Sequence, residues 1–128
     1  MLYLLDTYGW IEYFLGSQKG KNVRKLLIKQ DNVFITVESS LAEINGWCLK
    51  NNQDFEKCFR AIRANSTVVL VNQNDWIDAG KERFNQRLSQ PDFGLIDAIL
   101  LIKQKAFNCK LITGDRHFEK LKHVIFLK

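Results

Sequence analysis

Five short apolar segments recur along the chain, and most of them are rich in β-branched residues. They span residues 2–5, 33–36, 68–71, 110–113 and 124–127. Short continuous apolar runs are typical of parallel strands, because such strands are covered on both faces. The segments therefore predict five buried strands, which limits the chain to a few architectures.

The stretches between these segments carry apolar residues at steps of three and four positions. This spacing predicts amphipathic helices in the connections. Strands that alternate with helices favour right-handed βαβ units. We therefore expect an α/β fold, with a central parallel sheet of about five strands and helices on both faces. The clearest helical series are Val23, Leu26 and Leu27, then Val37, Leu41, Ile44 and Cys48, and finally Ile77, Phe84 and Leu88.

Glycine, proline and tryptophan refine this outline. Residues 16–20 predict a polar turn between two early helices. Pro91 and Gly94 predict a helix that begins near Phe93. The three tryptophans fall within helical patterns, so we expect them in the core: Trp10, Trp47 and Trp76.

Length and composition narrow the class of protein. At 128 residues the chain has the size of one domain, which we place at residues 1–128. No apolar run approaches the roughly 20 residues that span a bilayer, and the first residues do not resemble a signal peptide, so we expect no membrane association. Three cysteines without CxxC spacing favour reduced thiols and a cytoplasmic location over disulfides or a zinc site. Lys and Arg outnumber Asp and Glu by 19 to 14, which favours a polyanionic partner.

Two aspartates stand at the ends of predicted strands. Asp6 follows the first strand, and Asp115 closes the stretch Leu111-Ile-Thr-Gly-Asp115 after the fourth. Open parallel sheets bind ligands beyond the carboxyl ends of their strands, so acids there are candidates for a site. Each aspartate could instead cap the helix or turn that follows it, which is a common role for Asp. Position alone leaves both interpretations open.

Asp97 and Glu43 lie inside predicted helices. The stretch Leu95-Ile-Asp-Ala-Ile-Leu-Leu-Ile102 is apolar nearly all round, so a buried Asp97 needs a hydrogen bond, a counter-ion or a metal. Its place in the first turns also suits the helix dipole. Glu43 lies about 120° from the centre of its apolar stripe. Periodicity does not separate it from Glu38, and an exposed glutamate is the default for both.

Converging carboxylates repel one another unless a cation joins them, and oxygen ligands suit hard ions such as Mg²⁺ or Mn²⁺. The acids therefore favour a divalent metal site. Nucleophilic catalysis by a Ser-His-Asp or Cys-His arrangement has no support, because the only histidines, His117 and His123, both fall in the last segment. We expect surface or core-edge roles for both. A phosphoacceptor module would need an aspartate after the middle strand, where this chain has Asn72-Gln-Asn.

Five motifs of the chain resemble the PIN-domain nucleases, and most closely the small VapC-like toxins. The resemblance spans essentially the whole chain, and it rests on the order and spacing of the motifs together. The chain departs from the family pattern at Tyr8-Gly9, where small polar residues are common, and at Asn45-Gly46. The motifs are Tyr3-Leu-Leu-Asp6-Thr7, Trp10-Ile-Glu-Tyr-Phe14, Thr36-Val-Glu-Ser-Ser-Leu-Ala-Glu43-Ile44, Phe93-Gly-Leu-Ile-Asp97-Ala98 and Ile112-Thr113-Gly-Asp115-Arg-His-Phe118.

This resemblance implies a single PIN domain whose site holds Mg²⁺ or Mn²⁺. It ranks Glu43 above Glu38, which periodicity could not do. It also implies that hydroxyl groups support the site. The implied catalytic metal ligands are Asp6, Glu43, Asp97 and Asp115, and the implied supporting residues are Thr7 and Thr113.

The activity implied by the resemblance is metal-dependent endoribonuclease cleavage, with hydrolysis of RNA phosphodiester bonds. The implied setting is a VapBC-type toxin–antitoxin pair, with an antitoxin protein and a second copy of the chain as partners. Arg116 and Lys120 are expected to line an approach for the RNA backbone. One alternative is an RNA-processing or decay nuclease without an antitoxin. Another is a catalytically silent nucleic-acid or protein-binding module, against which the retention of all four acids argues.

Overall fold

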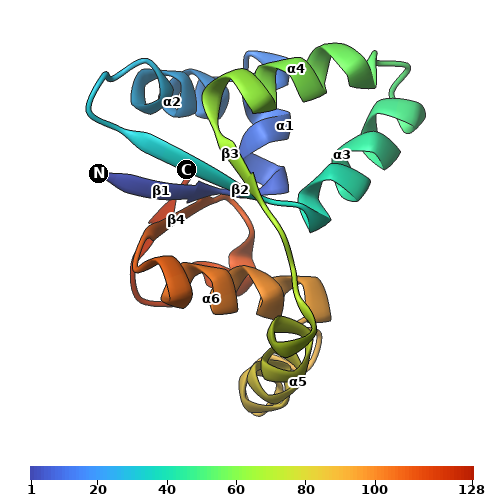
Figure 1. Ribbon diagram of the computed structural model, residues 1–128, viewed down its shortest axis with the longest axis vertical. Coiled ribbons are helices and arrows are strands. Elements are labelled where there is room, and N and C mark those ends of the chain that lie inside the picture. Colours follow the sequence, from blue (N-terminus) through green and yellow to red (C-terminus); the bar gives the residue numbers. More distant parts are fainter.

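The computed structural model describes residues 1–128 and contains a five-stranded parallel sheet with the order β3-β2-β1-β4-β5 (Figure 1). All five predicted strands are present, and the α/β class is confirmed. The third strand begins one residue earlier and ends two residues earlier than predicted. β1 spans Leu2–Leu5, β2 Val33–Val37, β3 Thr67–Val69, β4 Lys110–Thr113 and β5 Val124–Phe126.

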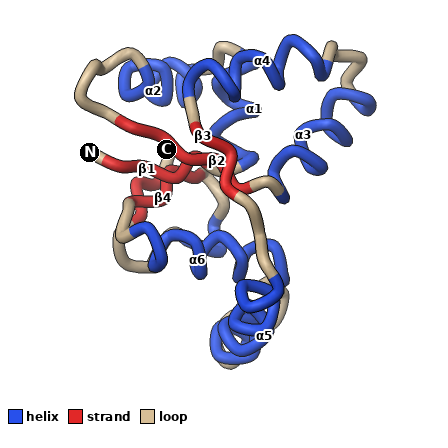
Figure 2. The backbone as a smooth tube through the Cα atoms, in the orientation of Figure 1, coloured by secondary structure: helices blue, strands red, loops and turns tan.

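Helices connect the strands and cover both faces of the sheet, as predicted (Figure 2). In Figure 1, α1 to α4 lie over one face and α6 lies over the other, whereas α5 packs against α6 away from the sheet. No helix is both long enough and apolar enough to cross a bilayer. α1 spans Thr7–Leu15, α2 Gln18–Leu27, α3 Ser39–Lys50, α4 Phe55–Asn65, α5 Gln73–Arg87 and α6 Leu95–Phe107, and the 3₁₀-helix η1 spans Arg116–Phe118.

The strands feed two separate cores, because successive side chains of a strand point to opposite faces. Leu4 and Leu111 belong to the core under α6. Tyr3 and Ile112 belong to the core under α1 to α4. Burial on both faces accounts for the continuous apolar runs of the central strands.

The strand order reverses between β1 and β4. From β1 the chain moves outward to β2 and β3, and β4 then lies on the other side of β1. The carboxyl ends of β1 and β4 therefore form a topological switch point, where open α/β sheets bind ligands. Asp6 directly follows β1, and Asp115 lies just beyond β4.

The apolar stripe that predicted α5 faces solvent. Ile77, Phe84 and Leu88 are 67%, 69% and 78% exposed. Trp76, which was predicted in the core, is 40% exposed. Periodicity thus located this helix correctly but assigned the wrong buried side.

Ion pairs explain the orientation of α5. Its buried side carries Asp75 and Glu82, and α6 faces it with two lysines. Lys103 Nζ lies 2.7 Å from Asp75 Oδ2, and Lys105 pairs with Glu82. Each acid on the buried side of α5 is matched by a lysine, which offsets the cost of removing its charge from water.

The start of α3 differs from the prediction. Val37, assigned to a helix by its spacing, is the last residue of β2 and pairs with Val69, so α3 begins at Ser39. The apolar spacing continued from strand into helix, and only strand pairing marks the boundary. α6 begins at Leu95, two residues after the predicted start.

The predicted turn over residues 16–20 is shorter than expected. Gly16 ends α1 with φ 65°, and the Ser17 side chain already caps α2. Gly20 therefore lies inside α2, where a Cβ atom would come within 1.9 Å of the Glu12 carbonyl oxygen in α1. This glycine permits the close approach of the first two helices.

Candidate functional site

A cavity of about 240 Å³ opens at the switch point, and we call it the carboxylate cavity. Ile11, Ile96 and Leu100 form its apolar walls. A larger cavity of about 480 Å³ beside the end of α6 has no carboxylate in its lining. The chemistry therefore favours the smaller cavity. The polar residues that line it are Asp6, Thr7, Tyr8, Glu43, Asp97 and Asp115, so all four predicted acids come together.

Each of the three aspartates uses one carboxylate oxygen as a helix cap. Asp6 Oδ1 accepts the N–H three residues ahead at 2.8 Å, in the first turn of α1. Asp97 Oδ2 accepts the N–H three residues before it at 2.9 Å, and Asp115 Oδ1 accepts the N–H two residues ahead at 2.9 Å. Capping and ligand binding were competing interpretations of the sequence. The geometry makes them compatible, because a cap engages one oxygen and leaves the other available.

Asp6 is the most buried of the four acids, with 3% of its surface exposed. Burial raises the pKa of its carboxyl to about 7, and the charges of Asp115 and Glu43 act in the same direction. Hydrogen bonds from Thr113 and from the Gly9 N–H oppose this rise. Thr113 Oγ1 also accepts the N–H of Asp115 at 3.0 Å. This hydroxyl therefore lies between two of the acids, behind the cavity wall.

The two glutamates that periodicity left indistinguishable have different surroundings. Glu43 is exposed in α3, and Thr7 Oγ1 donates a 2.6 Å hydrogen bond to its Oε1 at the cavity. Glu38 Oε1 instead accepts the N–H of Val71 at 2.7 Å. That bond ties the end of β2 to the segment after β3. Glu38 has a structural contact, and Glu43 lines the cavity.

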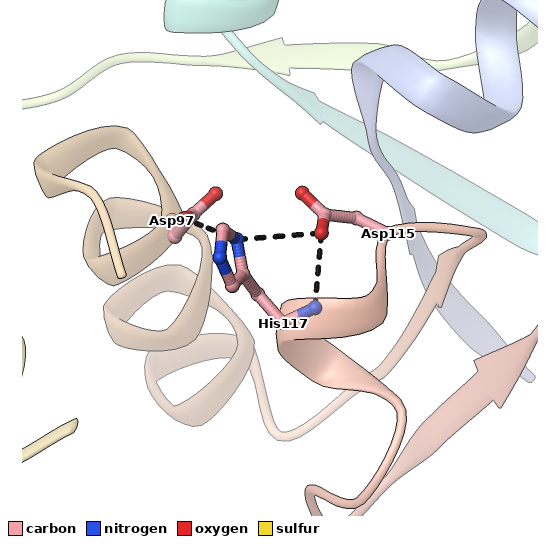
Figure 3. A group of neighbouring side chains, drawn as sticks. All are labelled: Asp97, Asp115 and His117. Carbon is pink, nitrogen blue, oxygen red and sulfur yellow. Dashed lines mark hydrogen bonds and ion pairs between the residues drawn. The ribbon is translucent and has the colours of Figure 1, made fainter. Parts of the chain in front are cut away.

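His117 is the residue that sequence reasoning missed. Its Nδ1 lies 3.1 Å from Asp97 Oδ2 and 3.4 Å from Asp115 Oδ1 (Figure 3). Its Nε2 lies 3.2 Å from Asp92 Oδ2. Burial lowers the pKa of this imidazole, but the hydrogen bond to Asp92 and the charges of Asp115 and Asp97 outweigh burial and raise it. The only signal in the sequence was its position two residues after Asp115.

Basic and aromatic residues lie beside the carboxylate cavity. Arg116 and Lys120 are exposed and line a neighbouring cavity of about 340 Å³, which also borders His117.

Tyr8 packs its ring against Gly114, where a Cβ atom would come within 2.2 Å of the ring. Lys19 Nζ donates to Tyr8 Oη at 2.8 Å. Tyr8, at which the chain departs from the PIN pattern, thus forms one wall of the cavity.

No protein-family model and no curated protein sequence matches the chain. Solved structures do match it over nearly their whole length. A toxin–antitoxin complex from Klebsiella pneumoniae gives a TM-score of 0.70 at 21% identity, covering 98% of each chain. Rickettsia felis VapBC2, bound to promoter DNA, gives 0.75 at 18% identity, covering 98% of this chain and 97% of that one. Mycobacterium tuberculosis VapC20, described as a toxin that cleaves the sarcin-ricin loop, gives 0.76 at 16% identity, covering 95% and 96%. The chain has the PIN-domain fold of the VapC toxins.

The PIN fold was expected from five short motifs, and this expectation is confirmed. TM-scores of 0.70–0.76, at identities of only 16–21%, establish the shared arrangement of helices and strands. In this PIN fold the acids come from four separate places: the end of β1, the middle of α3, the first turn of α6 and the end of β4. Only the tertiary structure brings them to one cavity.

The donor set of this PIN fold suits a hard divalent cation. No Lys or Arg pairs with any of the four acids, and His117 is the only basic side chain within 4.0 Å of them. Burial raises the pKa of Asp97, and the charge of Asp115 adds to this rise despite the hydrogen bond from Gly94. The four ionised carboxylates repel one another, and a hard cation such as Mg²⁺ or Mn²⁺, bound by their oxygens, would offset this repulsion.

Proposed function

We propose that the chain is a metal-dependent endoribonuclease that hydrolyses RNA phosphodiester bonds, and that it is the toxin of a VapBC-type toxin–antitoxin pair. One observation carries the proposal: four carboxylates from distant parts of the chain line one cavity without a Lys or Arg counter-ion. The fold shared with a toxin that cleaves the sarcin-ricin loop supports RNA as the substrate. The fold shared with toxin–antitoxin complexes supports the proposed pairing with an antitoxin.

The residues of the cavity have distinct roles in this proposal. Asp6, Glu43, Asp97 and Asp115 hold Mg²⁺ or Mn²⁺. When bound, the ion lowers the pKa of a coordinated water and offsets the negative charge that develops on the phosphate. The Thr7 hydroxyl orients Glu43 through its 2.6 Å hydrogen bond, and Thr113 supports Asp6 and Asp115.

The RNA backbone approaches the cavity past Arg116 and Lys120 in this proposal. Both side chains are exposed beside the carboxylates, and the chain carries a net charge of +5. Cations at the rim attract phosphates, whereas the acids alone would repel them. The metal and the basic rim together admit a polyanion to an acidic cavity.

RNA cleavage tests the proposal directly. The wild type and Asp6→Asn are incubated with RNA and Mg²⁺ or Mn²⁺, with and without a chelator. We expect cleavage only by the wild type and only with metal. Cleavage that survives in Asp6→Asn would reject the site, and cleavage indifferent to both metal and mutation would indicate a contaminating nuclease. RNA binding without cleavage would instead support a silent binding module.

We further propose that the protein acts in the cytoplasm, that an antitoxin protein inhibits it, and that it forms a homodimer. A small adjacent reading frame for a DNA-binding protein, whose purified product binds the chain and stops cleavage, would support the antitoxin. Metal-dependent cleavage with no such inhibitor would support an RNA-processing or decay nuclease.

Sedimentation equilibrium of the purified chain tests the proposed homodimer, and a monomer at all concentrations would reject it.

A further inference from the structure

We propose that His117 is a positioning residue that holds Asp97 and Asp115 in a fixed relative orientation. The inference rests on the proposed metal-dependent function and concerns how its site is built. The two aspartates belong to different elements, because Asp97 lies in the first turn of α6 and Asp115 precedes η1. The imidazole is the group that links their side chains.

The ring stands between the two carboxylates (Figure 3). His117 Nδ1 lies 3.1 Å from Asp97 Oδ2 and 3.4 Å from Asp115 Oδ1. This nitrogen is fully buried, and neither oxygen is aligned with it for a regular hydrogen bond. Nδ1 therefore lies within ion-pair distance of both acids, and the imidazole bridges their carboxylates.

The oxygens that face the ring are the same ones that cap helices. Asp97 Oδ2 accepts the Gly94 N–H, and Asp115 Oδ1 accepts the His117 N–H. In Figure 3 the other oxygen of each aspartate points away from the imidazole. Asp97 and Asp115 line the carboxylate cavity, whereas His117 does not. The ring thus engages one side of each carboxylate and leaves the other side for a cation.

Asp92 fixes the far side of the ring. Nε2 lies 3.2 Å from Asp92 Oδ2, and the ring packs edge-on against Phe93 with centroids 5.7 Å apart. Asp92 is otherwise exposed. Residues in such outer positions around a metal commonly set the orientation of its ligands.

Mn²⁺ affinity is the readout, measured by electron paramagnetic resonance titration and calorimetry without RNA. The variants are His117→Ala, His117→Asn and His117→Gln, with thermal unfolding of the metal-free proteins as a check on folding. All three variants keep the backbone N–H of residue 117, which donates to Asp115 Oδ1. Asn places its amide nitrogen near the position of Nδ1, whereas Gln reaches toward Nε2. Asn and Gln are therefore a matched pair that remains informative even if the Ala variant fails to fold.

We expect His117→Ala to weaken Mn²⁺ binding by about 10- to 100-fold, as loss of an outer-position residue does. His117→Asn should recover most of the affinity, and His117→Gln should not. Asp92→Asn should weaken binding by a smaller factor. Asp78→Asn removes the same charge from an exposed site on α5 and should leave binding unchanged.

Three results would overturn the positioning role. The first is unchanged Mn²⁺ affinity in a folded His117→Ala protein, and the second is equal loss in the Asn and Gln variants. The third is a nitrogen hyperfine coupling on bound Mn²⁺ that His117→Ala abolishes, which would make His117 a direct ligand. Wild-type Mn²⁺ binding without RNA cleavage would reject the proposed function alone, and absence of Mn²⁺ binding by the wild type would reject both.

Discussion

Thr7 Oγ1 donates a 2.6 Å hydrogen bond to Glu43 Oε1 and so joins the first turn of α1 to α3. Glu43 is exposed, and a long exposed side chain is otherwise free to move among several rotamers. This contact fixes its carboxylate beside Asp6 at the cavity. The position of an exposed residue in the site thus depends on one short interhelical hydrogen bond.

A first prediction concerns this pair. Thr7→Val should lower metal-dependent RNA cleavage by about tenfold or more, because the Glu43 carboxylate is no longer oriented. Glu43→Gln should lower cleavage further while changing the free energy of unfolding by less than about 0.5 kcal/mol, since the residue is exposed. Cleavage assays and urea unfolding provide the two measurements.

Glu38→Ala is the matched control for Glu43. It removes the acceptor of the Val71 N–H, so we expect a loss of about 1–3 kcal/mol in the free energy of unfolding. Mn²⁺ affinity should stay unchanged, because Glu38 does not line the cavity. If Glu38→Ala weakened Mn²⁺ binding and Glu43→Gln instead lowered the free energy of unfolding, the two glutamates would have exchanged roles.

A second prediction concerns pH and Asp6. Burial raises the pKa of this carboxyl to about 7, above the ordinary aspartate value of 3.8, so the native state binds the proton more tightly than the unfolded chain. The stability that this proton supplies is complete below pH 4 and is lost as the pH rises to about 7. The metal-free protein should therefore become less stable over this range.

Asp6→Asn isolates this contribution, because other titrating groups are common to both proteins. Asn keeps an oxygen that can accept the Gly9 N–H and cap α1. At pH 8 without metal we expect Asp6→Asn to be more stable than the wild type, with the difference vanishing near pH 4. Mn²⁺ should stabilise only the wild type. Identical pH profiles for the two proteins in urea unfolding would contradict the raised pKa.

A third prediction compares two helical glycines. Gly20→Ala should destabilise the protein by about 1–3 kcal/mol, because its Cβ would come within 1.9 Å of the Glu12 carbonyl oxygen and force α1 and α2 apart. Gly46→Ala should stabilise it by about 0.5–1 kcal/mol, since Gly46 lies inside α3 with no atom within 4 Å of the added methyl. Thermal unfolding of both variants measures the difference, and equal effects would refute the close approach of the first two helices.

A fourth prediction concerns RNA binding. Replacing Arg116 and Lys120 together with Ala should weaken binding of single-stranded RNA by catalytically inactive Asp6→Asn. Two lost phosphate contacts should reduce the slope of log affinity against log salt by about 1.4. Lys50→Ala, at the last residue of α3, should leave the slope unchanged. An unaltered slope in the double variant would place the RNA elsewhere on the surface.

Local patterns determined much of this protein. The five apolar runs predicted five strands of a parallel sheet, because burial on both faces leaves no polar alternation in the chain. The same runs placed Asp6 and Asp115 at strand ends, and the apolar helix around Asp97 marked a carboxylate that needs a partner. These features depend on neighbours within a few residues, so the sequence carries them directly.

Other features were decided only by tertiary structure. The buried side of α5 depends on ion pairs with α6, so the apolar stripe of α5 misled the prediction. Glu43 and Glu38 differ in their hydrogen-bond partners. Thr7 contacts Glu43 and Val71 contacts Glu38, and each partner lies more than 30 positions away in the sequence. His117 lies among carboxylates from two other parts of the chain. Residues so far apart meet only when the sheet and its helices assemble, and periodicity reports nothing beyond a few turns of one element.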